Sequence, residues 1–251
     1  MLASLAGPHA ARAARPVLRL AAENFPPFSH VENGRPKGLD WEVVRPVLDV
    51  LDFDAELLIM PWKRALRDVA QGNLDAVIGG TRGDLNEREE LLAFPDEPLS
   101  ASYSRLYFRR GQPFVFDGLF TLKGKSVAVV AGYSLPPDFN AAPYFHRQAV
   151  NTHEQCLRML LAGRVDLALV HAGVAEHLIR REGWRAQLGA DPTPIAPGQL
   201  YVCFSRRLGH EALARRFGEA LRKYKLGPAY AALLESYGIP AEMLRGVQWP
   251  G

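Results

Sequence analysis

The feature that most constrains the fold is a helix–turn–strand segment that occurs twice. "LRDVAQGNLDAVIGG" spans residues 66–80 and "LRMLLAGRVDLALVH" spans residues 157–171, and both contain Leu-Arg, then Gly, then Asp at a constant offset of 91 residues. Each copy predicts a helix that ends at Gly, followed by an apolar strand that is buried on both faces. Two such copies predict two lobes of similar α/β construction.

The rest of the chain alternates predicted strands and helices, which we interpret as parallel sheets. Strands are expected at 17–23, 55–60 and 125–132, and a helix at 38–52. Pro46 lies inside that helix and predicts a kink or a late start.

Two segments are interpreted as passages between the lobes, at 97–111 and at the Pro-rich 191–198. Lobe 1 is then discontinuous, with residues 17–103 and 200–245, and lobe 2 holds residues 104–199. Two crossover segments make a hinge, and ligand sites favour clefts between lobes.

Composition excludes several classes of protein. The 251 residues are 48% hydrophobic and 23% charged with a net charge of +3, which is ordinary for a globular protein. The absence of a Lys/Arg run argues against nucleic-acid binding. No apolar stretch approaches the roughly 18 residues of a membrane span.

The N-terminal residues 1–16 predict either a disordered tail or the remnant of a secretory signal. They are rich in Ala and carry an Ala-x-Ala pattern at 11–13 before Pro16. We favour export over a cytosolic tail.

Cys156 and Cys203 are the only cysteines. Because neither lies in a CxxC or a His-flanked cluster, we expect two buried thiols rather than a disulfide, and no metal or other cofactor.

The predicted strand ends should meet at one cleft, because ligands of open α/β sheets bind beyond the carboxyl ends of the strands. Trp62 begins the helix of the first copy, beside Pro61; aromatic rings are usually part of the core, but rings next to prolines at strand ends often line clefts instead. The residues delivered by the strand ends are Phe25, Phe28, Gly80, Thr81, Tyr133, Ser134 and His171. For His171, a satisfied buried polar role is the alternative.

The segment "DAVIGGTRGDLNER" at 75–88 predicts an anion site. Capping-box spacing at 84–87 or 86–89 would leave helix N–H groups open to an acceptor, and Arg88 or Arg82 offers a planar fork for a carboxylate. A surface arginine on a solvated helix is the alternative. Catalysis is not expected, because no GxSxG, HExxH or GxxxxGK[ST] segment occurs.

Several stretches together resemble the bacterial extracellular solute-binding proteins of the polar amino-acid type, the periplasmic receptors of ABC importers. They are "NFPPFSHVENGRPKGLDWEVVRPVLDVL", "PWKRALRDVAQGNLDAVIGGT" with "ER" and "LLAFPDEPL" after it, "LKGKSVAVVAGYS" and "LLAGRVDLALV", in order over roughly residues 17 to 240. The resemblance implies a two-lobed, type II venus-flytrap fold. It also implies a monomer in the periplasm that captures a small carboxylate-bearing solute for an inner-membrane permease.

The resemblance assigns roles to individual residues. Phe25 and Trp62 would be aromatic platforms, Gly80 and Thr81 backbone and hydroxyl contacts, and Arg88 the carboxylate clamp. In lobe 2, Ser134 would supply a hydroxyl beside Tyr133. Because the segment 75–88 is at least one residue longer than is usual in the family, Arg82 is the alternative clamp.

One position departs from the family. The acidic residue that accepts the α-ammonium of an amino acid is here His171. Burying an unpaired ammonium costs several kcal/mol, so we expect a solute that carries a carboxylate or other anion without the usual α-ammonium, with His171 donating to it.

Two other functions are weighed against this one. Cyclohexadienyl dehydratases resemble these receptors but keep a glutamate where this chain has Val174, so an enzyme is not favoured. A sensory module is the third hypothesis, and it would have to act in trans.

Overall fold

The molecule has two lobes joined by long strands. The computed structural model describes residues 14–82, 90–133 and 135–237. The described strands form a sheet in the order β4-β1-β5-β12-β7-β10-β8-β9. Its first half consists of β1 (Val17–Ala22), β4 (Asp54–Ile59) and β5 (Ala76–Thr81), and its second half of β8 (Ser126–Val130), β9 (His146–Val150) and β10 (Leu167–His171).

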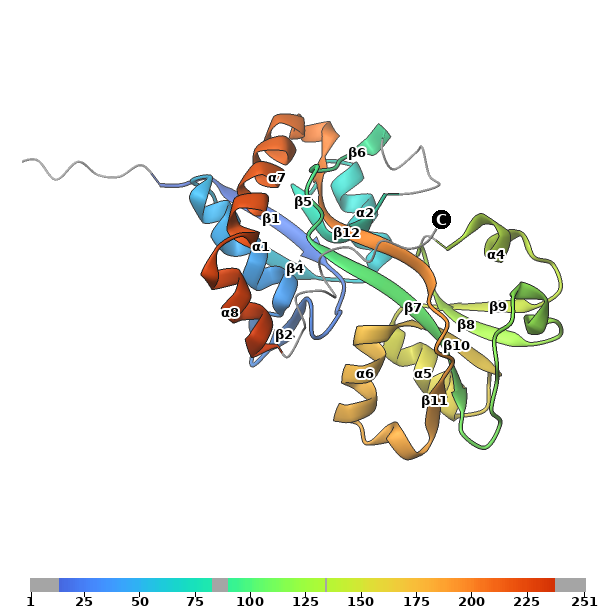
Figure 1. The fold of residues 1–251 in the computed structure, drawn as a ribbon. Helices are drawn as coiled ribbons and strands as arrows, with labels where there is room; N and C mark the ends of the chain where they lie inside the picture. The colour runs from blue at the N-terminus through green and yellow to red at the C-terminus, as the bar shows by residue number, and fades with distance from the viewer. Residues whose placement is uncertain (1–13, 83–89, 134, 238–251) are drawn as a thin grey trace, which may run out of the picture.

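The crossing strands β7 (Ser100–Arg109) and β12 (Ile195–Ser205) run side by side from one lobe to the other (Figure 1). They carry the chain in opposite directions, so β12 is antiparallel to β5 and β7 is antiparallel to β10. The prediction of parallel sheets is right within each lobe, where β1 pairs with β4 and β5, and β8 with β9 and β10. It is wrong at the crossing strands.

Helices cover the sheet on both faces. In the first lobe α1 (Leu39–Val50) and α7 (Glu211–Lys225) pack on one face together with α8 (Pro228–Ser236), and α2 (Trp62–Ala70) packs on β1 and β5. In the second lobe α5 (His153–Leu161) and α6 (Ala172–Arg181) pack against β10, and the short α4 (Pro137–Ala141) lies near β8 and β9 (Figure 1).

The two copies of the repeated segment have the same structure. Helix α2 leads into β5 and helix α5 into β10, and the turns contain Gly72 at φ +77° and Gly163 at φ +69°. The Asp has the same role in both copies, because the Asp75 side chain accepts the backbone N–H of Arg19 at 2.8 Å and the Asp166 side chain accepts that of Ser126 at 2.7 Å. Asp therefore ties the start of each strand to the start of its parallel neighbour.

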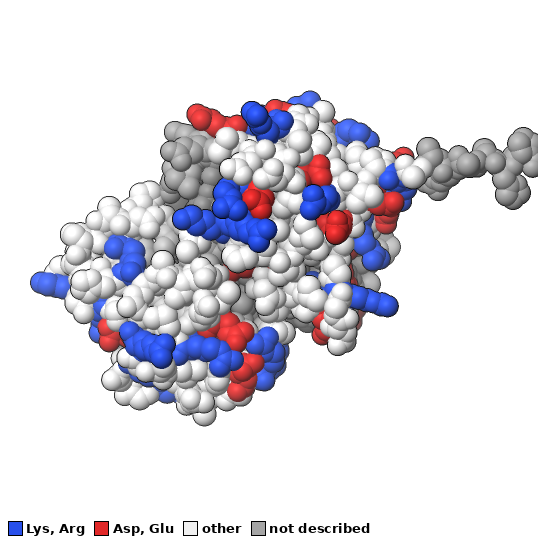
Figure 2. Space-filling view, turned by 180° about the vertical axis from the view of Figure 1, so that it is seen from behind, with Lys and Arg blue, Asp and Glu red and all other residues white. Residues whose placement is uncertain are grey.

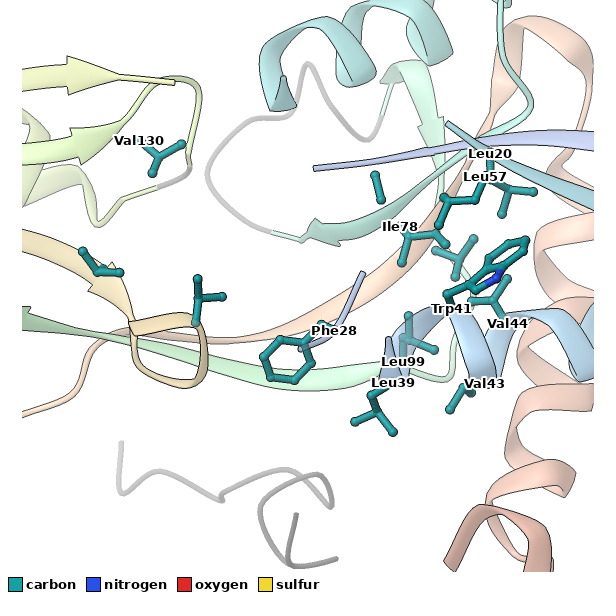
Figure 3. Close-up of a cluster of buried hydrophobic side chains, with 14 of the residues drawn as sticks. Leu20, Phe28, Leu39, Trp41, Val43, Val44, Leu57, Ile78, Leu99 and Val130 are labelled. Atoms are coloured by element: carbon teal, nitrogen blue, oxygen red, sulfur yellow. The ribbon is translucent and has the colours of Figure 1, made fainter. Parts of the chain in front are cut away.

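The strands of the repeat are buried on both faces, as the sequence predicts. In β5, Ala76 and Ile78 face the cluster that includes α1, while Val77 faces a second cluster under α2. Figure 3 shows the first cluster, in which Ile78 and Leu20 lie beside Trp41. The second lobe has a further cluster on the other face of β8 and β10.

Several details differ from the expectations. The helix α1 begins at Leu39 and continues through Pro46, so the late start is wrong. A hairpin of β2 (His30–Glu32) and β3 (Arg35–Lys37) was not predicted, although Asn33 and Gly34 both have positive φ as a tight hairpin turn requires. Cys156 and Cys203 are buried thiols rather than halves of a disulfide, as expected.

Shorter elements complete the description: β6 (Leu92–Ala93), β11 (Leu188–Ala190), η1 (Leu119–Leu122), η2 (Trp184–Ala186) and η3 (Arg206–Leu208). Among the described helices, none is both long and apolar enough to cross a membrane. Acidic and basic side chains are interspersed on the face shown in Figure 2.

Candidate functional site

A cavity lies between the lobes at the carboxyl ends of the strands. It is partly open to solvent, and most of its wall is apolar. The first lobe and the crossing strands contribute Ala22, Glu23, Phe25, Ser29, Asp40, Trp62, Ile78, Gly79, Thr81, Ser104 and Leu200; the second lobe contributes Tyr133, Leu135 and His171. The strand-end rule therefore predicted the location of the cavity correctly.

Phe25 is held by a turn that is bonded to the start of α1. The Phe25 N–H donates to the Ser29 carbonyl at 2.7 Å, and the Asp40 N–H donates to the Phe28 carbonyl at 2.8 Å. Gly38 is required here, because a Cβ at its φ of +117° would overlap the Phe28 carbonyl. The turn directs the Phe25 ring at the second lobe, where its centroid lies 4.7 Å from that of His171.

Phe28 packs between the lobes beside the cavity. It is buried in the hydrophobic cluster drawn in Figure 3 and meets His171 edge-on with ring centroids 5.3 Å apart. A Cβ on Gly173 would come within 2.9 Å of the Phe28 ring, so the second lobe fits closely around it. Phe28 thus lies at the predicted junction but is not part of the cavity wall described above.

His171 caps α6 and presents a hydrogen-bond donor. Its Nδ1 accepts the backbone N–H of Val174 at 3.4 Å, and burial lowers its pKa to about 3. A neutral imidazole whose Nδ1 accepts must carry its proton on Nε2. That Nε2 is buried and has no partner among the described residues. His171 therefore offers a neutral N–H at the cavity rather than a positive charge.

A chain of three polar side chains crosses from one lobe to the other. The Tyr133 hydroxyl donates to Glu23 Oε2 at 2.8 Å and lies 2.8 Å from His153 Nε2. Burial raises the pKa of Glu23 to about 7 from 4.5, against the opposing hydrogen bond from Tyr133. Burial lowers the pKa of His153 well below its ordinary value, and nearby His171 lowers it further.

The wall of the first lobe combines Trp62 with the end of β5. Trp62 is buried and meets Tyr133 edge-on, with ring centroids 6.2 Å apart. Thr81 lines the cavity as expected, but the glycine that lines it is Gly79 rather than Gly80. Gly80 faces the other way, and a Cβ there would overlap Cys203 Sγ. Because β5 continues to Thr81, neighbouring residues in it face opposite sides, so Gly79 and Thr81 lie toward the cavity and Gly80 lies away from it.

Of the two arginines predicted to bind a carboxylate, Arg82 lies outside the cavity wall. Arg82 is exposed and bonded within the first lobe, where it donates to the Pro95 carbonyl at 2.9 Å and stacks on Phe94 and Tyr201. It is not part of the cavity wall. Arg88 and Ser134 lie outside the described residues, so their roles stay predictions.

The charges at the described wall are two carboxyl groups, Glu23 and Asp40, and no Lys or Arg contributes to that part of it. Burial raises the pKa of Asp40 to about 7, while the Ser100 side chain and Lys225 lower it. Sequence reasoning missed Glu23, although it directly follows β1 and the strand-end rule applies to it. It also missed Asp40 and His153, which lie at helix starts that the rule does not cover.

Comparison with known proteins identifies the family. The profile of the bacterial extracellular solute-binding proteins, family 3, matches residues 18–240. The chain belongs to this family. Within curated proteins it is similar to the probable amino-acid-binding protein YxeM of Bacillus subtilis (strain 168), with 24% identity over 84% of this chain and 79% of that protein. The resemblance inferred from the sequence is confirmed.

Solved structures share the two-lobed fold. One is a histidine kinase sensor domain with similarity to periplasmic binding proteins, which has a TM-score of 0.79 and 22% identity and covers 90% of this chain and 97% of its own. Another is an ancestral arginine-binding protein bound to arginine, with a TM-score of 0.76, 23% identity and coverage of 89% and 99%. At such identities these two structures establish the fold alone.

Proposed function

We propose that this family member captures a small solute bearing a carboxylate or related anion between its lobes. The observation that carries the proposal is the Nε2–H of His171, a buried donor that has no partner among the described residues and belongs to a side chain lining the cavity. A buried donor without a partner is costly, and a solute oxygen removes that cost.

The same observation argues against an α-ammonium at this position. His171 is a neutral donor there, and a second N–H donor facing it would leave both groups unpaired. Phe25 and Trp62 supply apolar surfaces, and Thr81 adds a hydroxyl. Arg88, or Arg82 after a rearrangement, is proposed to supply the positive charge that the described wall lacks.

The lobes are proposed to comprise residues 17–103 with 200–245, and residues 104–199. The protein is proposed to work as a monomer in the periplasm and to deliver its solute to an ABC permease, and the description of the family as extracellular supports the export. The sensor-domain likeness supports a second candidate, a ligand-binding sensory module. Permease and ATPase genes beside this one would favour import, and a kinase gene would favour sensing.

A thermal-shift screen tests solute binding. The panel contains amino acids, keto acids, dicarboxylates and inorganic anions. A solute that binds only the folded protein raises its stability by about 2.7 kcal/mol at one hundred times Kd. We expect hits among keto acids or dicarboxylates, absent from a Ser104→Phe variant whose new ring occupies the cavity. Strong shifts with common α-amino acids alone would contradict the proposed solute class.

A further inference from the structure

The bond between Glu23 and Tyr133 joins two parts of the molecule that the hinge can separate. Glu23 directly follows β1 in the first lobe, and Tyr133 follows β8 in the second. His153, at the start of α5, is bonded to Tyr133 within the second lobe, and their rings meet edge-on at 5.1 Å. Opening the lobes would leave the Tyr133–His153 pair intact and break the bond to Glu23.

The two lobes also touch each other on either side of the Glu23–Tyr133 bond. A Cβ on Gly132 would lie 3.7 Å from Trp62 and from Lys63, and the neighbouring Tyr133 ring meets Trp62. The Phe25 ring covers the other side, 5.4 Å from that of His153. The bond therefore lies among buried side chains when the lobes meet, and it becomes hydrated when they part.

Glu23 is poorly compensated when it is buried. Its Oε2 accepts from Tyr133, but its Oε1 is buried without a partner among the described residues. The titratable groups that face it are Tyr133 itself, His153 and His171 as neutral rings, the buried thiol of Cys156 and the Asp40 carboxyl across the cavity. None of these described groups is a cation, so among the described residues a proton is the available means of neutralising the carboxylate.

We propose that Glu23, Tyr133 and His153 form a latch between the lobes, and that closing the latch takes up one proton at Glu23. The proton satisfies the charge of the buried carboxylate while Tyr133 keeps its bond across the hinge. An anionic solute beside Glu23 reinforces proton uptake, whereas a cationic one replaces the proton. In the absence of solute, the latch is a property of the fold alone.

The direction of the pH effect follows from linkage. The pKa of Glu23 is about 7 with the lobes together and returns toward 4.5 once it is hydrated. Because the pKa is higher in the closed form, protonation favours closure. This advantage is complete at a pH below the pKa of the open form and is lost as the pH rises through the pKa of the closed form. The closed-to-open ratio should therefore rise about tenfold per pH unit as the pH falls from about 7 to about 5, and stay constant above pH 8.

Single-molecule energy transfer without solute tests this. Dyes are attached at Val50→Cys and Val115→Cys, which are 76% and 77% exposed on opposite lobes, whereas the native thiols are buried. The wild type should show more closed molecules at pH 5.5 than at pH 8.5. Glu23→Gln should abolish this dependence, and Tyr133→Phe should lower the closed-to-open ratio by about 2- to 13-fold, the loss of one hydrogen bond.

A second tyrosine–glutamate pair provides a matched control. The Tyr237 hydroxyl donates to Glu42 Oε1 at 2.7 Å, and both residues belong to the first lobe. Tyr237→Phe and Glu42→Gln should leave closure and its pH dependence unchanged. The latch would be overturned if closure of the wild type did not depend on pH, or if the wild type had no open population at pH 8.5. It would also be overturned if Glu23→Gln kept the pH dependence, or if Tyr237→Phe behaved like Tyr133→Phe. Because no solute is added, failure here is distinct from failure of the proposed function.

Discussion

Replacing His171 separates its two roles, as the cap of α6 and as the donor at the cavity. Alanine removes both roles, asparagine can keep both, and aspartate keeps the cap but offers only an acceptor. Losing a cap costs about 0.5 to 2 kcal/mol, and the 3.4 Å bond from Val174 places this one toward the lower end. In urea unfolding without solute, the alanine variant should therefore be about 1 kcal/mol less stable than the asparagine variant.

Solute affinity should follow a different order. If an acceptor on the solute loses its buried donor, the cost is about 1 to 3 kcal/mol, which is roughly 5- to 150-fold in Kd. Aspartate adds a third carboxyl group to a wall that already holds Glu23 and Asp40, so its loss should be the largest. Calorimetry with the strongest hit of the screen should rank wild type and asparagine above alanine, and alanine above aspartate.

A matched control is available in the first lobe. His210 contacts Asp75 at 2.8 Å and is not part of the described cavity wall. His210→Ala should lower stability without changing Kd. If His171→Asp binds the solute as tightly as the wild type, or if His171→Ala and His210→Ala have the same effect on affinity, the assignment of His171 as the donor is refuted.

Three further predictions concern stability. Gly80→Ala should cost about 1 to 3 kcal/mol in urea unfolding because its Cβ overlaps Cys203 Sγ, and adding Cys203→Ala should restore most of it, since the next atom lies at 3.5 Å. The raised pKa of Asp40 favours the folded state below pH 4, and this advantage is lost as the pH rises through 7. The stability of Asp40→Asn minus that of the wild type should therefore be larger at pH 8 than at pH 5. Thr152→Ala should cost about 1 kcal/mol by removing the acceptor for the Gln155 N–H, and Thr152→Ser should not; thermal melts compare the two.

The repeated segment made most of the fold predictable. Its helix, turn and buried strand depend on local signals, namely apolar spacing, a Gly and an Asp, which act the same way in both copies. The direction of the crossing strands could not be read in this way. It depends on how the chain crosses between the lobes. The two predicted passages indicate that it crosses twice, but they do not show which strands pair there.

The residues of the cavity wall were predicted where strand ends determine them and missed where long-range contacts do. Thr81, Tyr133 and His171 follow from the strand-end rule. Gly79 and Gly80 were confused because adjacent residues of a strand face opposite sides, and the strand extends further than expected. The chain from Glu23 to His153 depends on Tyr133 meeting a residue 110 positions away, which no local pattern encodes.

Hydrogen exchange with and without the strongest hit of the screen tests the central claim, that one solute is held between both lobes. Slower exchange is predicted at the amides of Phe25, Phe28, Ser29 and 79–81 in the first lobe and of 171–174 in the second, with little change in α7. Protection confined to one lobe, or centred on α1 and α7, would contradict a binding site between the lobes.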